Sequence, residues 1–439
     1  MTARHLAKQS LALFAFALFW MKQPLTIGGL PAFPSDLLFL IAGAAWLLSL
    51  GRSAGLRFSA GFWPLLLYFA ALAVSTLFAT DIRTSAFKLA TEAYLITLPV
   101  LVYNLVDTWS DLKRIFLSCI AGATIVAVIG AGTVLLFPLL GRQSFLAFSL
   151  HHYGTLPPGP YPRLEVTFEY PAMMANYLAL ALMLLILSKQ LGWLPARIAT
   201  SVGVLMLVTA LFALTPGFGG LLVVLGIWFW HRNRGTALGL SCLGASIATC
   251  ILEVVVAAVT PILHPTAPFL IHMPGLSSPL APAVRLLAWL AAARTFAAHP
   301  LVGCGIGIDP VHVPYVHPTG EFAVVTDAHN TLLSVAAQAG LPGIIGLGAV
   351  LLVAIRQMAR GGMVSFGLAL AFVGGILVQG LVGAFEDARH LWFAYGLMLV
   401  ARKLEAEMVP AEGFEPPTFG LQNRCTTTVL SRPGPTSAS

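Results

Sequence analysis

The sequence places a polar cluster directly before a long apolar segment. Asp327, His329 and Asn330 precede an apolar run that contains a Gly-Leu-Pro-Gly break at 340–343. An imidazole can take a proton from a hydroxyl group near neutral pH, and the positive end of a helix dipole disfavours its charged form. Asp and Asn are both common helix caps. We therefore predict that His329 is catalytic at a helix start, with a plain surface histidine as the alternative.

Two arginines lie in a helical, almost wholly apolar stretch upstream of that cluster. Arg285 and Arg294 are nine residues apart, which at about 100° per residue places them on opposite faces of a helix. Only one of them can face a shared groove, and the other would reach toward lipid headgroups. Headgroup anchoring is the ordinary role of such an arginine. The glycine-rich turn and the His-Asn pair that follow favour a binding site.

Further ionisable groups lie within or beside apolar segments, where they are costly. Lys88 precedes Glu92 by four residues, so an ion pair along one helix explains both. Glu253 has no such partner and is the better candidate for lining a cavity that binds substrate. The Glu-Asp-Ala-Arg-His cluster at 386–390 is predicted to be a solvated turn.

Glycines and histidines in the same region indicate neither a nucleotide nor a metal. Gly303, Gly305 and Gly307 form a G-x-G-x-G without the preceding strand that a dinucleotide fingerprint requires. We expect a tight loop that brings backbone near a ligand. No two histidines have metal-ligand spacing on a predicted helix, so we predict no metal and no cofactor.

The composition shows what must position these polar residues. The chain is 58% hydrophobic and 9% charged, with a mean hydropathy of +0.87, whereas soluble proteins carry about 25% charged residues. The net charge of +7 does not indicate nucleic-acid binding, because no run of five basic residues exists. We predict an all-α integral membrane protein.

About twelve segments approach the roughly 20 apolar residues that a membrane span needs. The predicted helices lie at 10–24, 35–50, 62–79, 86–106, 112–137, 170–188, 196–214, 217–230, 237–259, 331–355, 363–385 and 390–402. With the N-terminus inside, fourteen Lys and Arg residues fall on one side and only eight on the side with the longer loops. Both termini are therefore predicted to be cytoplasmic.

These assignments divide the chain into four parts. Residues 1–259 hold the first nine helices and an outer loop at 138–169, and residues 260–328 form a large outer loop with an interfacial helix. Residues 329–402 hold the last three helices. The tail, 403–439, is predicted to be disordered because its end has no apolar periodicity. Its Gly-Phe-Glu-Pro at 413–416 can be encoded by GGTTCGAACC, a transfer RNA gene arm, so we predict a read-through.

The order of the motifs resembles the O-antigen ligase/polymerase superfamily. Arg285-x-x-x-Trp289, then His-Pro-Leu-Val-Gly-Cys-Gly at 299–305, His329-Asn330 and Gln-Ala-Gly-Leu-Pro-Gly at 338–343 follow as in the family's long periplasmic loop. The block RLEVTFEYPAMMANYLAL is similar to the family's entry to a middle span. The resemblance implies a bundle like those of C-type glycosyltransferases, in the bacterial inner membrane.

The resemblance also implies a reaction. A glycan would pass from a polyprenyl diphosphate donor to a hydroxyl acceptor, such as a lipid A core sugar, at the periplasmic face. Arg285 would hold the diphosphate, His329 would activate the acceptor hydroxyl or stabilise the transition state, and Asn330 would contact substrate. Membrane lipids would surround the protein, and neither nucleotide nor metal would be required.

The turn before the eighth helix departs from the family pattern. Family members carry Ser-Arg-Gly there, and the arginine is associated with the diphosphate. This chain reads Leu-Thr-Pro-Gly-Phe-Gly-Gly, with Phe218 where the arginine is expected. Arg163, Arg294 or Arg389 would then replace it, or donor binding is altered.

Two other functions remain open from the sequence. A polymerase of the same superfamily would join repeat units to a lipid-linked chain and would share the His-Asn loop. A transporter of lipid-linked glycans would show inverted repeats and helices broken at mid-membrane. The sequence shows no internal repeat, and its ionisable groups gather at one face.

Overall fold

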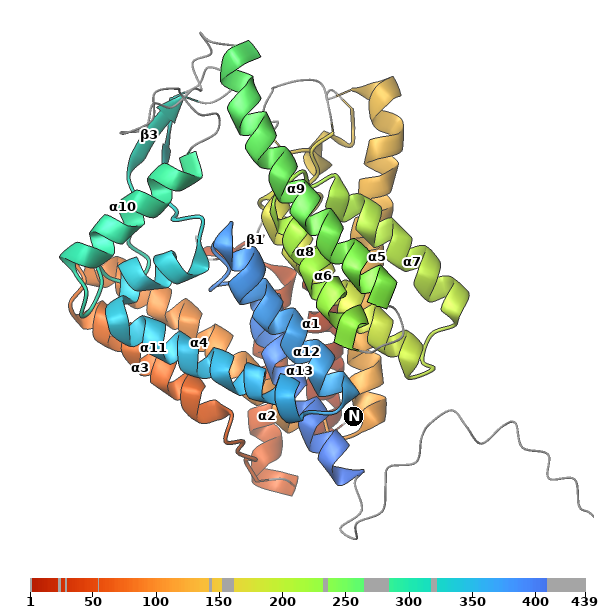
Figure 1. Cartoon of the computed structure of the whole chain (residues 1–439). Helices are drawn as coiled ribbons and strands as arrows, with labels where there is room; N and C mark the ends of the chain where they lie inside the picture. Colours follow the sequence, from red (N-terminus) through yellow and green to blue (C-terminus); the bar gives the residue numbers. More distant parts are fainter. Residues whose placement is uncertain are drawn as a thin grey trace, which may run out of the picture.

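The computed structural model shows a bundle of helices and, within the residues that it describes, two small β-hairpins (Figure 1). The structure describes residues 2–22, 25–27, 30–53, 55–141, 144–151, 162–231, 236–263, 284–316 and 322–408. Parts of the two predicted outer loops and the end of the tail, 409–439, lie outside this description.

The helices follow one another with short connections over most of the chain. They are α1 (Ala3–Ala17), α2 (Pro34–Ser53), α3 (Phe62–Leu77), α4 (Ile82–Leu105), α5 (Trp109–Leu140), α6 (Pro171–Gln190), α7 (Ala196–Leu211), α8 (Gly217–His231), α9 (Thr236–Leu263), α10 (Val284–Ala298), α11 (Thr331–Arg360), α12 (Met363–Val373) and α13 (Arg389–Glu407). The antiparallel hairpins pair β1 (Leu25–Ile27) with β2 (Leu30–Ala32), and β3 (Val313–Val316) with β4 (Phe322–Val325).

The helices are those of a membrane protein. Within the described residues, five helical segments are long and apolar enough to cross a bilayer, namely α4, α5, α6, α11 and the segment Met363–Leu381. Five shorter apolar helices accompany them. A helix overlaps each of the twelve segments predicted from the sequence, and α10 lies where the interfacial helix was expected.

The bundle is densely packed inside and apolar outside. Most residues of α6 are buried, and Trp392 and Tyr395 of α13 are fully buried in the same core. On the outer surface, long apolar side chains such as Leu77 and Leu139 remain mostly exposed. Large exposed apolar side chains of this kind suit contact with lipid.

Two predicted helices differ most from the observed ones. The first begins at Ala3 rather than at residue 10, because the Thr2 side chain accepts from the His5 amide and caps an earlier start. The segment 363–385 is not one helix. It changes to a π-helical turn at 374–378 and a 3-10 turn at 379–381, where Gly374 packs so closely on α8 that a Cβ would lie 2.2 Å from Val224 Cγ2.

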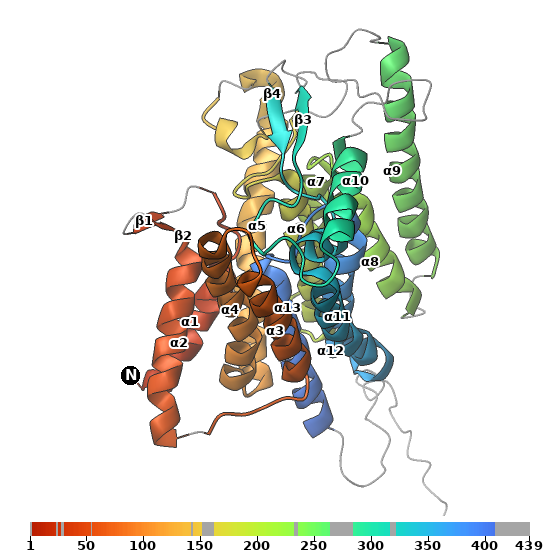
Figure 2. The same ribbon diagram turned by 90° about the vertical axis from the view of Figure 1, so that its left-hand side faces the viewer.

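Most of the loop structure within the described residues gathers at one end of the bundle. This end, called the loop face here, is formed by residues 144–151, 162–170 and 382–388 together with α10 and the β3–β4 hairpin. Figure 2 shows α10, β3 and β4 together at the top of the molecule. The N-terminus and the end of α13 lie at the opposite end (Figure 1).

Candidate functional site

His329 stands immediately before α11 and is held by its neighbours in the chain. Asn330 is the N-cap, and its Oδ1 accepts from the Leu333 amide at 3.0 Å. His329 itself adopts a left-handed backbone, with φ 47°. Asp327 stabilises that conformation by accepting from the His329 amide at 3.1 Å. Of the two predicted caps, Asn330 is therefore confirmed, whereas Asp327 bonds a residue that precedes the helix.

The Asp327 carboxylate also orients the imidazole. Its Oδ2 lies 3.1 Å from His329 Nδ1. This contact turns the Nδ1 side of the ring toward the carboxylate and leaves Nε2 on the other side of the ring. The imidazole is 40% exposed, and a substrate hydroxyl can therefore reach it.

The helix α10 holds the backbone of His329 from the other side. Trp289 Nε1 donates to the His329 carbonyl at 3.4 Å. The face of α10 that meets α11 is made of Ala288 and Ala292, both fully buried, which lets the two helices approach closely. Arg285 precedes Trp289 by one helical turn and is partly buried on this side of α10.

Arg294 lies apart from this contact. It is exposed, whereas Arg285 is partly buried, as the nine-residue separation predicts for opposite helix faces. The Glu253 side chain lies outside the described part of the structure, so its predicted place in a cavity stays a prediction. Of the two α10 arginines, Arg285 is the one that shares a helix face with Trp289.

The glycine-rich loop after α10 closes a break in α11. Gly340 has φ 64° and ψ −161°, which interrupts the helix as predicted. The Leu341 amide donates a hydrogen bond to the Pro300 carbonyl at 2.8 Å. The break would leave two backbone carbonyls of α11 without partners, and the loop supplies donors to both. The Ala337 carbonyl accepts from the Cys304 amide at 2.9 Å, and the Gln338 carbonyl accepts from the Gly305 amide at 3.1 Å.

The three loop glycines therefore meet protein rather than a ligand. A Cβ at Gly303 would lie 2.2 Å from the Gln338 carbonyl oxygen. At Gly305 it would lie 2.5 Å from Ala79 Cβ, and at Gly307 it would lie 2.7 Å from Lys88 Cβ. The close backbone approach that the spacing predicts is real, but its partners are α11 and the corner between α3 and α4.

A chain of hydrogen bonds leads from this loop to a buried carboxyl group. The Gly307 amide donates to Gln338 Oε1 at 2.8 Å. Gln338 Nε2 donates to Ser334 Oγ at 2.8 Å, and Ser334 Oγ donates to Glu386. Burial raises the pKa of Glu386 to about 8, and the nearby negative charge of Asp387 adds to the effect. Glu386 is therefore a neutral acid near pH 7.

Asp387, the residue after Glu386, belongs to an ion-pair cluster with α4. Lys88 pairs with Asp387, and its Nζ lies 3.4 Å from Glu92 Oε1. Burial by itself raises the pKa of Asp387, but the charge of Lys88 and a hydrogen bond with Glu92 outweigh it and hold that pKa below its usual range. The predicted Lys88–Glu92 pair is confirmed.

The prediction of a solvated turn at 386–390 is wrong. Glu386 is 9% exposed and His390 is fully buried. The turn is drawn inward because Thr331, at the first position of α11, accepts from the Phe385 amide at 2.9 Å and donates to the Gly383 carbonyl at 3.1 Å. The side-chain Nδ2 of Asn330 donates to the Leu381 carbonyl at 3.3 Å. Both polar groups of Asn330 are thus engaged within the protein.

Arg389 is also engaged within the protein. Its guanidinium pairs with Asp36 at 3.2 Å and lies 4.8 Å from the centroid of the Phe33 ring and 5.8 Å from that of Tyr94. The side chain is only 17% exposed. This geometry joins α13 to α2 and α4, and it does not favour Arg389 as the replacement for the missing family arginine.

Arg163 is placed at the turn where the family arginine is expected. Its Nε donates to the Ala213 carbonyl at 3.3 Å, directly before α8. Phe218 packs against the core within the first turn of α8. The start of α8 is bonded in turn to the segment that holds Asn330, through Gln379 Nε2 and the Gly217 carbonyl at 2.7 Å. Of the three predicted replacements, Arg163 is the one that contacts this turn.

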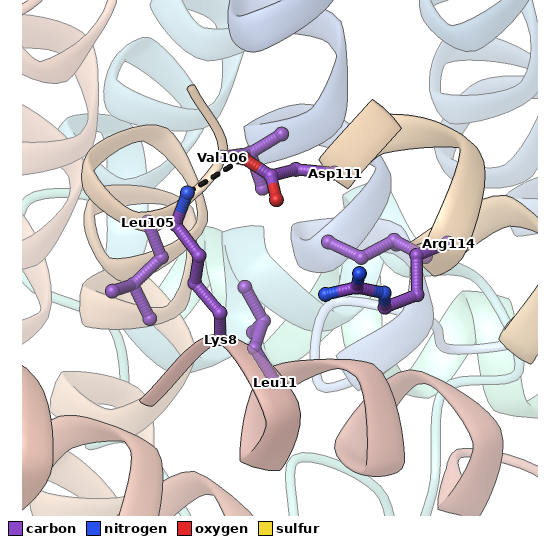
Figure 3. Close-up of a pocket in the computed structure, with 7 residues that line it drawn as sticks. Lys8, Leu11, Leu105, Val106, Asp111 and Arg114 are labelled. Carbon is purple, nitrogen blue, oxygen red and sulfur yellow. Dashed lines mark hydrogen bonds and ion pairs between the residues drawn. The ribbon is translucent and has the colours of Figure 1, made fainter. Parts of the chain in front are cut away.

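A small pocket at the opposite end serves a structural purpose. Lys8 pairs with Asp111 at 2.6 Å across it, joining α1 to α5, and Arg114 reaches toward it from another side (Figure 3). Lys8 also pairs with Asp107 at 2.8 Å. Lys8 therefore holds α1 against the start of α5 at this pocket.

The loop face is where the reactive side chains gather. Within the described residues, no group of three or more His, Cys, Asp or Glu side chains has an arrangement that could hold a metal ion. No protein-family model matches the chain, and no curated protein matches it. Function is therefore inferred from the geometry around His329.

Proposed function

We propose that the protein is a membrane glycosyltransferase of the O-antigen ligase type. It would transfer a glycan from a polyprenyl diphosphate to a hydroxyl acceptor, such as a lipid A core sugar. In this proposal the twelve apolar helices span the bacterial inner membrane in a C-type glycosyltransferase bundle. The loop face is periplasmic and both termini are cytoplasmic. The observation that carries the proposal is the His329–Asp327 pair, held by the Arg-x-x-x-Trp helix.

The pair supports general base catalysis. Asp327 lies 3.1 Å from Nδ1, so Nε2 accepts the proton of the acceptor hydroxyl. The acceptor oxygen then forms a bond to the anomeric carbon of the donor glycan. The bond from that carbon to the phosphate oxygen breaks, and the lipid diphosphate leaves with the electron pair.

The leaving diphosphate needs positive charge more than a strong acid. Arg285 is partly buried one helical turn from Trp289, whose side chain contacts the His329 backbone. A guanidinium binds phosphate oxygens through two parallel hydrogen bonds. We assign Arg285 to the diphosphate, with Arg163 as the second cation because it contacts the turn before α8.

The broken helix gives little support to a transporter. Transporters leave backbone carbonyls of broken helices open to the coordinating ion. Here the Ala337 carbonyl accepts from the loop, and the Gln338 carbonyl accepts from Gly305 and from Ser75 Oγ. The break therefore seats the loop that carries the motifs.

Transfer by the full chain in proteoliposomes tests the proposal. The donor is a polyprenyl diphosphate glycan, the acceptor is lipid A core, and the product is resolved by gel. We expect His329→Ala to lower transfer by at least about 100-fold, the range of a lost general base. His312→Ala is the matched control, because His312 is an exposed loop histidine.

Three outcomes decide between the candidate functions. Glycan on lipid A core that depends on His329 supports the ligase. Extension of the lipid-linked glycan without lipid A core identifies the polymerase instead. Full transfer by the His329→Ala protein rejects the mechanism.

A further inference from the structure

We propose that the end of the bundle opposite the loop face binds the phosphate headgroup of an anionic phospholipid. The site is a surface groove of about 450 Å³ where α3, α4, α11 and α13 meet. It is separate from the His329 site and does not depend on the proposed transferase activity.

The groove is formed by a close approach of α3 to α13. Gly61, at the start of α3, faces Leu399, and a Cβ there would lie 2.6 Å from Leu399 Cδ2. The Tyr395 hydroxyl donates to the Gly61 carbonyl at 2.8 Å and fixes the two helices together. The groove is therefore part of the packed bundle.

The cations of the groove come from the end of α13. Arg402 is partly buried, and among the described residues no hydrogen bond or ion pair is found for it. Lys403 uses one donor for the Val106 carbonyl at 3.0 Å and lies 5.1 Å from the centroid of the Tyr103 ring. Both side chains line the groove, so donors for an anion are available there.

Other side chains add polar groups to the lining of the groove. Ser59 contributes a hydroxyl group and Gln357 contributes an amide group. Glu407 is the one acidic side chain among the lining residues, so with Arg402 and Lys403 the groove has a net positive charge.

The surroundings favour a lipid over a free anion. Phe58 and Trp63, on either side of the segment that lines the groove, are 52% and 65% exposed. The centroids of their two rings lie 5.3 Å apart. Aromatic side chains of this kind mark the headgroup level of a membrane protein, and basic residues beside them attract anionic lipid. Acyl chains would follow the exposed apolar face of α3.

Native mass spectrometry of the full chain in detergent tests the proposal. Dioleoyl phosphatidylglycerol is titrated against the wild type and against Arg402→Gln. One basic residue near a membrane surface contributes about 1 kcal/mol, so we expect roughly fivefold weaker binding. Arg360→Gln is the matched control, because Arg360 is an exposed arginine at the end of α11 that does not line the groove.

A charge change of the opposite sign makes the test independent of folding defects. Glu407→Gln removes the negative charge of the groove and should strengthen phosphatidylglycerol binding. Phosphatidylcholine should bind more weakly, and inorganic phosphate at the same concentration should not compete. Equal binding of both lipids, competition by free phosphate, or equal loss in Arg360→Gln would each overturn the proposal.

Discussion

At the scale of single residues, the candidate base is oriented from two directions. The Asp327 carboxylate accepts a hydrogen bond from the backbone amide of His329 and lies 3.1 Å from its Nδ1 nitrogen. Trp289 holds the carbonyl of the same residue. A side chain with such support keeps one geometry, which is what a general base needs to meet a hydroxyl group. The left-handed φ of 47° is maintained by these contacts.

Glu386 makes stability depend on pH at the loop face. Burial raises its pKa to about 8, so the folded state holds the proton more tightly than the unfolded state. The stabilisation is fully present below the ordinary glutamate pKa of about 4.3 and is lost as pH rises through about 8. We expect the melting temperature in detergent to fall as the pH rises from about 4.3 to about 8, and to fall less in Glu386→Gln.

The neighbouring charges do not change the sign of that prediction. The negative charges of Asp387 and Asp327 both act to raise the pKa of Glu386, in the same direction as burial. Glu407→Gln, an exposed change, is the control and should show the wild-type pH dependence. An identical alkaline fall in Glu386→Gln would contradict the assignment.

At the scale of elements, α11 and the glycine-rich loop form one unit. The loop supplies amides to the carbonyls freed at the break, and the break supplies room for the loop. Gly340 requires a left-handed φ of 64°, and a Cβ there would lie 2.7 Å from the Val302 amide nitrogen. Neither element can keep its shape without the other.

Substitution of that glycine tests the unit. Gly340→Ala should lower the free energy of unfolding by about 1–3 kcal/mol, because it combines a strained φ with a steric clash. Gly348→Ala in the same helix has nothing within 4 Å of its new Cβ and should be neutral or slightly stabilising. Thermal unfolding of the two variants in detergent gives the comparison. Equal melting temperatures would show that the break is not constrained.

At the scale of the whole molecule, the two ends differ in how charge is used. The loop face collects carboxyl groups around His329, while the opposite end uses one carboxylate to hold three cations. Asp107, between α4 and α5, pairs with Arg4 at 2.8 Å, with Lys8 at 2.8 Å and with Arg57. These contacts tie α1 and the entry to α3 to the middle of the bundle.

Removing that carboxylate should loosen the bundle. Burial raises the pKa of Asp107, but hydrogen bonds from the three cations outweigh it and hold the pKa well below its usual range. The stabilisation is therefore present above about pH 4 and lost as pH falls through the lowered pKa. Asp107→Asn should lower the free energy of unfolding at pH 7 by about 1–3 kcal/mol. Asp309→Asn, an exposed loop change, is the control in the same thermal measurement, and equal stability of the two would refute the role.

Much of the fold follows from local signals. Apolar length predicts a helix in each of the twelve segments, and the Asp-x-His-Asn order predicts the start of α11, because capping uses residues close in the chain. The break at Gly340 is likewise local. The early start of α1 was missed because its first turn is polar, and the irregular turns at 374–381 were missed because they follow from packing on α8.

The chemistry around His329 was only partly predictable. The sequence by itself determined an apolar helical bundle and a histidine beside a carboxylate at the N-terminus of a helix. These features depend on composition and on neighbours within a few residues. Only the tertiary structure decided that Glu386 is buried, that Arg389 is locked by Asp36, that Arg163 reaches the turn before α8 and that the three glycines pack on protein. Burial and pairing between distant segments set the state of each of those groups, and no local pattern encodes them.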